Sequence, residues 1–246
     1  MDYQLDFSNF EIWLLATLLF LVRYAVIAGL LFIIFYAWKR KDFFRLKLQQ
    51  KFPSNIDIKR ELFYSVMTFI IYGSSVCVFV YWSKNEMTNE YKDFSAFGAW
   101  YFVFSILLMI VMHDTYFYWT HRLMHHRAFF KYVHKTHHSF HNPTPWAAFA
   151  FHPLESIISM GIIPIIIFLI PFHQWALIVF VTLLTLNNVL IHLGYRLPKF
   201  MKARFQNTAV EHDLHHNGFQ KNYGLYFTLW DKLMGTYYRM NTKEDF

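Results

Sequence analysis

Three apolar runs, each long enough to cross a lipid bilayer as a helix, limit most strongly what this chain can fold into. They cover Ile12–Trp38, Leu62–Trp82 and Phe97–Trp119. A hydrocarbon core of roughly 30 Å takes about 20 helical residues to cross. The chain is 56% apolar and 22% aromatic but 16% charged, whereas soluble domains average about 25% charged residues. We therefore predict an all-α, integral membrane helical bundle.

A fourth apolar block, Leu154–Leu193, is too long for one span and carries Pro171-Phe172-His173 near its middle. Because proline lacks a backbone donor and breaks helices, we interpret this block as a tight helical hairpin. The sequence thus predicts five spans, or four spans with a re-entrant pair. It shows no internal repeat or flexible linker, so we expect residues 1–246 to form a single membrane domain.

The distribution of Lys and Arg predicts the orientation of these spans. Of the 23, eight lie between Lys39 and Arg60, four between Arg122 and Lys135, and eight between Arg196 and Lys243, all on one side. Basic residues collect in cytoplasmic loops, so we expect the histidine clusters described next and the C-terminus to be cytoplasmic. This topology explains the net charge of +7 without nucleic acid. No basic residue precedes Arg23, so we expect an uncleaved N-terminus that faces outward.

Eight histidines stand in three clusters: His121-x-x-x-His125, His134-x-x-His137-His138 and His212-x-x-His215-His216. Helix positions i, i+3 and i+4 share one face, so each cluster can direct two or three imidazoles at a common point. One tetrahedral zinc takes about four ligands, so eight convergent imidazoles indicate a two-metal centre. The lone Cys77 excludes a thiolate cluster.

Two polar residues near the end of the hairpin, Asn188 and His192, are four positions apart and share a helix face. Polar groups are costly in an apolar helix unless they face protein or a cavity. We predict that His192 is a ninth metal ligand. Asn188 is either a weak or water-mediated ligand or a packing contact between helices. The histidines that are not predicted as ligands are His113, His126, His141, His152 and His173.

Asp114 precedes His121 by seven residues, about two helical turns, and lies on the same stripe. We predict a catalytic role in which its carboxylate accepts a hydrogen bond from a histidine or a water and holds it in place, without binding metal. The alternative is a local bond within its own helix. Glu155, together with His152, is a weaker candidate for a similar role.

These stretches resemble the fatty acid hydroxylase and sterol desaturase superfamily of integral-membrane di-iron oxidoreductases. The resemblance covers about Phe97 to Tyr238 and includes two tail motifs, Asn222-Tyr-Gly224 and Trp230-Asp-Lys-Leu-Met-Gly235-Thr236. It implies a catalytic region at 97–238, preceded by N-terminal spans at 1–96.

The resemblance further implies a non-haem centre of two Fe ions that uses O2 and two electrons to hydroxylate or desaturate a C–H bond of a lipid, such as a sterol or a fatty acyl lipid. Some members carry a further histidine where this chain has Asn188. The resemblance passes ligand roles to the clustered residues His121, His125, His134, His137, His138, His212, His215 and His216, with His192 matching a ligand that precedes the last cluster.

The sequence contains no flavin or nicotinamide fingerprint, so we expect a separate electron donor: a cytochrome b5-like protein, a ferredoxin or a reductase. A membrane zinc hydrolase remains an alternative, but it needs about three ligands and a carboxylate, which leaves most of these histidines unused. A metal transporter is the other alternative, yet its ligands would follow a path through the bilayer midplane. The tail carries no retention signal, and we expect a bacterial inner membrane rather than endoplasmic reticulum.

Overall fold

The protein is described by a computed structural model over residues 7–198, 205–218 and 220–239. Within these ranges the regular structure is helical, and extended pairing is limited to isolated β-bridges. The α-helices are α1 (Asn9–Phe32), α2 (Asn55–Lys84), α3 (Gly98–Met124), α4 (Phe130–Val133), α5 (Lys135–His138), α6 (Pro153–Met160), α7 (Ile162–Leu169), α8 (Gln174–Ile191), α9 (Ala209–Gly218) and α10 (Leu229–Leu233). The other helical segments are the π-helix η1 (Ile33–Trp38) and the 3-10 turns η2 (Phe44–Leu46), η3 (Phe94–Ala96) and η4 (Pro145–Phe149).

Four helices are long and apolar enough to cross a membrane: α1 with its π-helical continuation, α2, α3 and α8. The three predicted spans are therefore confirmed. Helix α2 starts before the apolar run because Ser54 and Asp57 form a capping box that satisfies its first backbone donors. The same device, built from Ser8 and Glu11, starts α1.

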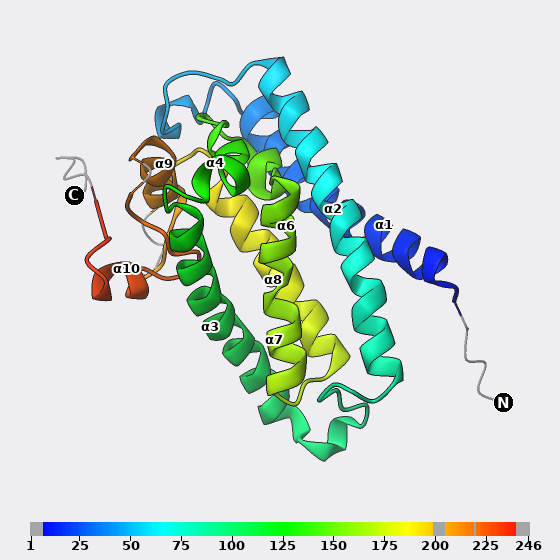
Figure 1. Ribbon diagram of the computed structural model, residues 1–246. Helices are drawn as coiled ribbons and strands as arrows, with labels where there is room; N and C mark the ends of the chain where they lie inside the picture. Colours follow the sequence, from blue (N-terminus) through cyan, green and yellow to red (C-terminus); the bar gives the residue numbers. More distant parts are fainter. Residues whose placement is uncertain (1–6, 199–204, 219, 240–246) are drawn as a thin grey trace.

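The predicted hairpin is also confirmed, with arms of unequal character. Helices α6 and α7 together form a shorter apolar arm, Pro153–Leu169, and α8 returns beside it (Figure 1). The first arm breaks at Gly161, because Pro164 offers no N–H to the carbonyl of Met160. His173 caps the second arm by accepting a hydrogen bond from the Trp175 N–H.

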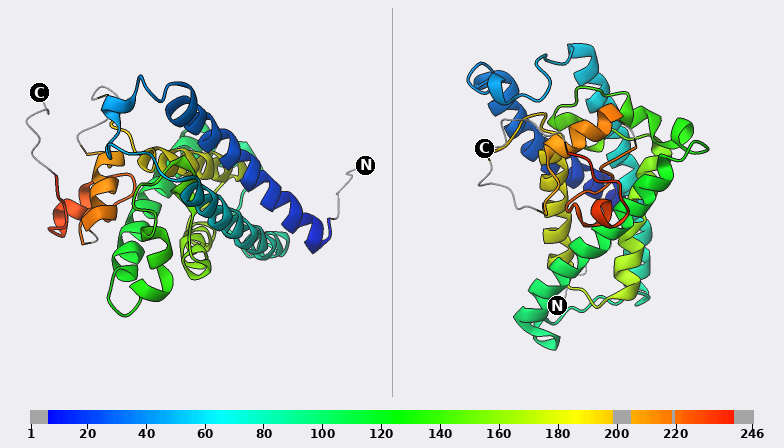
Figure 2. Two further views of the ribbon diagram at one scale, coloured as in Figure 1. Left: turned by 90° about the horizontal axis from the view of Figure 1, so that it is seen from above. Right: turned by 90° about the vertical axis from the view of Figure 1, so that its left-hand side faces the viewer.

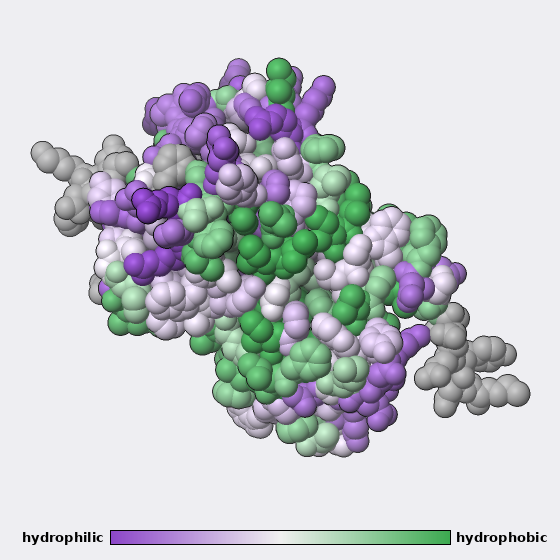
Figure 3. Space-filling view, viewed as in Figure 1, coloured by the Kyte–Doolittle hydropathy of each residue, from purple (hydrophilic) through white to green (hydrophobic). Residues whose placement is uncertain are grey.

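The short helices α4 and α9 lie at one end of the molecule, and the long helices extend from that end toward the other (Figure 1). Two further views show α9 and α10 lying against that end and α1 lying beside α2 (Figure 2). Hydrophilic residues collect over the same end, whereas hydrophobic residues cover the middle (Figure 3). Large apolar side chains in this middle band are exposed: Leu19 is 69% exposed and Leu107 is 57% exposed. Soluble proteins rarely expose such a surface, so this band fits contact with lipid.

The segment around η4 joins α1, α2 and α8. The carbonyl of Trp146 accepts hydrogen bonds from the Tyr24 hydroxyl at 2.6 Å and from the Ser65 hydroxyl at 2.9 Å. Asn188 of α8 donates its side-chain amide to the carbonyl of Ala148 at 2.5 Å. This is the packing contact that the sequence left open for Asn188, and its role as a weak or water-mediated ligand stays a prediction.

Gly73 lets α1 and α2 approach closely, because a Cβ at this position would lie 3.0 Å from the Trp13 carbonyl oxygen and closer still to the Thr17 hydroxyl. Small residues allow such contact between membrane helices.

We expect Gly73→Val to lower stability by about 1–3 kcal/mol, as overpacking does, measured by thermal unfolding in detergent. Ser74→Val is the matched control, because Ser74 is exposed on the same helix. Equal melting temperatures for the two variants would contradict this packing.

Candidate metal centre

Nine histidines meet at the hydrophilic end of the bundle in two groups. The first group consists of His121, His125, His134, His138 and His215. The second consists of His137, His192, His212 and His216. Within each group the candidate ligand nitrogens all lie within 4.8 Å of one another. The groups adjoin, since the ring centroids of His138 and His216 are 4.6 Å apart.

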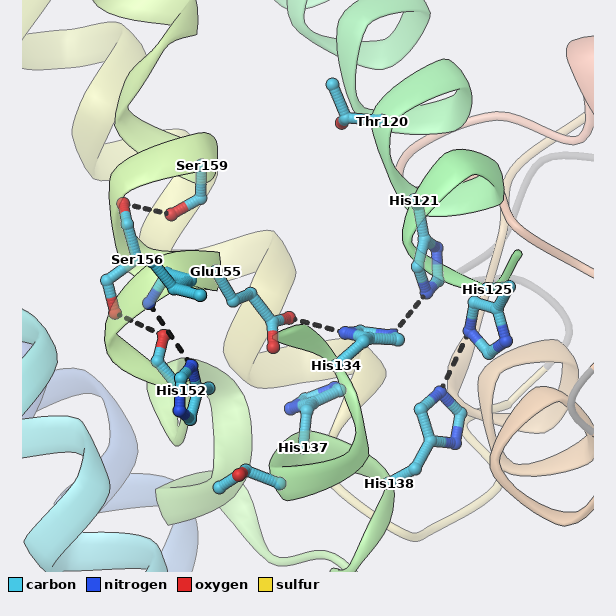
Figure 4. A network of polar contacts seen from close by, with 12 residues as sticks. Thr120, His121, His125, His134, His137, His138, His152, Glu155, Ser156 and Ser159 are labelled. Carbon is cyan, nitrogen blue, oxygen red and sulfur yellow. Dashed lines mark hydrogen bonds and ion pairs between the residues drawn. The ribbon is translucent and has the colours of Figure 1, made fainter. Parts of the chain in front are cut away.

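Four helices, α3, α5, α8 and α9, bring these side chains together. The first cluster comes from the last turn and C-cap of α3, and the second from the cap and body of α5 (Figure 4). His192 is the C-cap of α8, and the last cluster lies on α9. All nine residues predicted from the sequence are thus side by side, and their role as metal ligands remains a prediction.

Each three-histidine cluster directs two imidazoles at one group, as expected, and its third imidazole at the other group. His134 and His138, four positions apart, belong to the first group, whereas His137 belongs to the second. On α9 the assignment is reversed. His212 and His216, four positions apart, belong to the second group, and His215 belongs to the first. The reason is geometric, since residues i and i+4 lie about 40° apart around a helix, whereas i+3 and i+4 lie about 100° apart.

Backbone carbonyls set the direction of several imidazole lone pairs. The Nδ1 atoms of His121, His192 and His215 lie 2.8, 2.8 and 2.7 Å from the carbonyl oxygens of Tyr223, Asn188 and Lys221. A carbonyl oxygen only accepts, so each Nδ1 carries the hydrogen and each Nε2 carries a lone pair. This pattern is typical of metal-binding histidines, whose second nitrogen donates to a carbonyl or a carboxylate.

The Nε2 atoms so oriented lie against one another. His134 donates its Nδ1–H to Glu155 at 2.7 Å, and its Nε2 lies 3.0 Å from the Nε2 of His121. When Glu155 is a carboxylate, both Nε2 atoms carry lone pairs, which repel at this distance instead of sharing a hydrogen. Two nitrogens bound to one metal at about 2.1 Å and at right angles would be about 3.0 Å apart. The donor atoms therefore fit a shared metal cation.

The other Nε2 contacts have the same spacing. In the first group the nitrogens of His138 and His215 are 3.1 Å apart. In the second group the nitrogens of His192 and His212 are 2.9 Å apart. The spacing expected around one metal thus occurs in both groups.

Burial keeps these imidazoles neutral. It lowers the pKa of His134, His137 and His212 well below the usual value, and the neighbouring histidines lower it further. Burial also lowers the pKa of His192 to about 4. A neutral imidazole is the form that binds metal, so the folded chain holds its donors ready without a proton to displace.

Glu155 is the site residue that the sequence argument undervalued. Its side chain is 3% exposed and accepts the hydrogen bond from His134 (Figure 4). His152, with which we associated it, caps α6 by accepting from the Leu154 N–H. A signal was present, because Glu155 is the only charged residue between His152 and Arg196. A carboxylate alone in so apolar a block needs a buried polar partner.

Asp114 does not hold a histidine as we expected. Its carboxylate accepts hydrogen bonds from the backbone N–H groups of Tyr226 and Phe227, at 2.9 and 3.2 Å. The expected contact fails because Asp114 lies two turns below His121, where the loop after α9 passes beside α3. Tyr223 in that loop supplies the carbonyl oxygen that accepts a hydrogen bond from His121. Asp114 therefore holds the loop that orients His121.

The tail motifs hold the other side of this loop. Asp231 accepts hydrogen bonds from the backbone N–H groups of Tyr223 and Gly224, both at 2.8 Å. Gly224 is required sterically, because a Cβ there would collide with the carbonyl oxygen of Phe227. The motifs therefore position the carbonyl that orients His121.

The five histidines that were not predicted to be ligands lie outside both groups. His113 is hydrogen-bonded to the Tyr226 hydroxyl at 2.9 Å. His152 and His173 cap helices, and His126 and His141 are exposed.

An apolar cavity of about 140 Å³ lies beside the histidines. Its wall includes Phe117 and Phe151, whose ring centroids are 4.9 Å from that of His121 and 5.3 Å from that of His137, respectively. A second cavity of about 420 Å³ shares lining residues with the first, including Phe79 and Leu177. The two cavities form an apolar space bounded by α1, α2, α7 and α8, and Phe117 and Phe151 separate this space from the histidine groups.

Comparison with known proteins gives a family match. The fatty acid hydroxylase family model matches residues 106–236. A Delta(7)-sterol 5(6)-desaturase of Gibberella zeae is 32% identical over 193 residues, which are 78% of this chain and 59% of that protein. The lathosterol oxidase of Homo sapiens is 36% identical over 142 residues, 57% of this chain and 47% of that enzyme.

A Delta(7)-sterol 5(6)-desaturase of Aspergillus fumigatus is 33% identical over 167 residues, which cover 60% of this chain and 52% of that protein. The chain thus spans about half the length of these curated relatives. No solved structure matches it.

The neighbouring residues His125 and His126 provide a matched test of the metal site, since His125 belongs to the first group and His126 is exposed outside both. We expect His125→Ala to reduce the metal bound per chain, because one donor is lost, and His126→Ala to keep the wild-type content. Elemental analysis of purified protein measures both. Equal metal content in the two variants would show that His125 is not a metal ligand.

A second test concerns the loop that Asp114 holds. We expect Asp114→Ala to speed amide hydrogen exchange at Tyr226 and Phe227 and to weaken metal retention by about 10–100-fold, because the partner of His121 is displaced. Asp114→Asn keeps an acceptor oxygen and should have a smaller effect. Unchanged exchange in the alanine variant would show that other contacts hold the loop.

Proposed function

This chain belongs to the fatty acid hydroxylase family, and we propose that it is a membrane-bound non-haem di-iron oxidoreductase that uses O2 to hydroxylate or desaturate a C–H bond of a lipid. The observation that carries this proposal is the pair of adjoining histidine groups at the end of an apolar cavity. The relatives reported above are named for oxidation of sterols, which makes a sterol the leading candidate substrate.

We propose that one Fe ion is held by the five-histidine group and the other by the four-histidine group. Imidazole nitrogen suits iron, zinc, copper and nickel alike, but activating O2 for oxidation of a C–H bond requires a redox metal. When bound, the two irons would supply the O2-activating, oxidising chemistry, with electrons from a separate donor.

The chain's own residues would orient and protect the centre. Carbonyls and Glu155 fix the imidazole rings from outside, through the Nδ1 contacts described above. Phe117 and Phe151 would exclude water between the cavity and the histidines. The cavity would direct the hydrocarbon part of the substrate toward the same place.

We propose that the centre faces the cytoplasm, on the side where 20 of the 23 basic residues are predicted to lie. A separate donor, such as a cytochrome b5-like protein, a ferredoxin or a reductase, would supply electrons there. The relatives named above come from a fungus or a mammal, so a bacterial inner membrane stays a prediction from the sequence. Residues 1–246 as one domain, with the catalytic region at 97–238, also stays a prediction.

The two alternatives explain less of the structure. A zinc hydrolase would leave at least one complete histidine group without a role. A metal transporter needs ligands along the bilayer, whereas both groups lie at one end of the long helices (Figures 1 and 4).

The function is tested by expressing the chain in cells, comparing lipid extracts, and measuring iron in the purified protein. We expect wild type to add an O2-dependent lipid product and to contain about two irons per chain. His138→Ala and His215→Ala should abolish the product while inserting normally into the membrane, because insertion depends on the apolar spans. His141→Ala, an exposed histidine outside both groups, is the control. Zinc in place of iron, or full turnover in both alanine variants, would disprove the proposal.

A further inference from the structure

Arg23 places a positive charge in the middle of α1, a helix that is otherwise apolar from Ile12 onward. A charged side chain within a membrane span is expensive. Such residues face the protein interior or a cavity, and they commonly mark a functional site. Arg23 takes no part in the metal centre described above, so its presence needs a separate explanation.

The described part of the chain gives the Arg23 guanidinium no hydrogen bond and no ion pair. Its Nε is buried without a partner. Its one recorded contact is with the Phe20 ring, whose centroid lies 5.0 Å from the Arg23 Cζ. A guanidinium has five N–H donors and no acceptor, so Arg23 presents donors that lack an oxygen to bind.

Those donors lie in the wall of the cavity system. Arg23 lines both the 140 Å³ cavity beside the histidines and the 420 Å³ cavity that follows it. Val181 of α8 also lines both, whereas Asn188 lines the first alone. These two residues are seven apart, roughly 10 Å along the helix. Arg23 thus borders the junction of the cavities, away from the metal end.

No acidic residue in the described part of the chain forms an ion pair with Arg23. Glu90 is the only carboxylate in the lining of either cavity, and it accepts a hydrogen bond from Ser83 at the far end of α2. The remaining wall near Arg23 is apolar, including Val76 and Phe79. A molecule inside the cavity is well placed to supply the missing acceptor, because Arg23 lines both cavities.

We propose that Arg23 binds the polar oxygen end of the lipid substrate, a carboxylate or a hydroxyl, while the hydrocarbon part extends through the inner cavity to the histidines. An oxygen acceptor would satisfy the buried donors, and a carboxylate would also neutralise the charge. Arg23 would therefore determine which carbon of the lipid reaches the metal centre. The identity of this lipid as a substrate rests on the proposed function.

The test measures binding of radiolabelled palmitate and radiolabelled cholesterol to purified, metal-loaded protein. The variants are Arg23→Met, which removes the donors, Arg23→Lys, which keeps the charge, and Val22→Met, a control at the exposed neighbouring residue, which lines neither cavity. We expect Arg23→Met to weaken binding of at least one probe by about tenfold or more, the usual effect of losing a hydrogen bond to a charged group. Arg23→Lys should restore part of the palmitate binding, and Val22→Met should bind both probes as wild type does.

Loss confined to palmitate would identify a carboxylate as the ligand, and loss confined to cholesterol would identify a hydroxyl. Equal binding by wild type and Arg23→Met, including no binding by either, would overturn the proposal. The assay requires no turnover, so its result is independent of the oxidation assay above. Where turnover is measured, Arg23→Met should raise KM more than it lowers kcat, whereas damage to the metal centre would lower kcat and iron content together.

Discussion

Repulsion between imidazole lone pairs is the constraint around which this structure is organised. His121 and His134 both direct an Nε2 lone pair at the same point, with the two nitrogens 3.0 Å apart and both rings buried. Rotating either ring would break its bond to the Tyr223 carbonyl or to Glu155. A cation between these two nitrogens removes the repulsion, and a metal supplies one without protonating either histidine.

The need to hold these rings explains parts of the fold that the membrane does not require. The loop after α9 is anchored from two directions, to Asp114 on a spanning helix and to Asp231 in the tail. Each carboxylate accepts two backbone N–H groups, which is a stronger hold than a neutral acceptor would give. The loop is thereby a rigid support for one carbonyl oxygen. The tail motifs thus serve the metal centre although none of their side chains belongs to either histidine group.

The sequence predicts the local features well and the non-local ones poorly. Apolar length predicts the spans, and the proline at 171 predicts the hairpin, because both effects act over neighbouring residues. The nine histidines are likewise recognisable by spacing. Their division into groups of five and four is not, because the placement of His137 and His215 depends on how α5 and α9 face each other. The partners of Asp114 and Glu155 were missed for the same reason, since they lie 112 and 21 residues away in the chain.

The unequal size of the two groups has a consequence for where a substrate would react. The side-chain amide of Asn188 donates to the Ala148 carbonyl, and its backbone carbonyl accepts from the Nδ1 of His192, so this residue orients one member of the four-histidine group. Asn188 also lines the inner cavity, as does Phe151 beside His137. Phe117 beside His121 lines this cavity too, so residues next to both groups border the apolar space. A metal with fewer protein ligands keeps more positions open, so of the two groups beside this space the four-histidine group would offer more open positions.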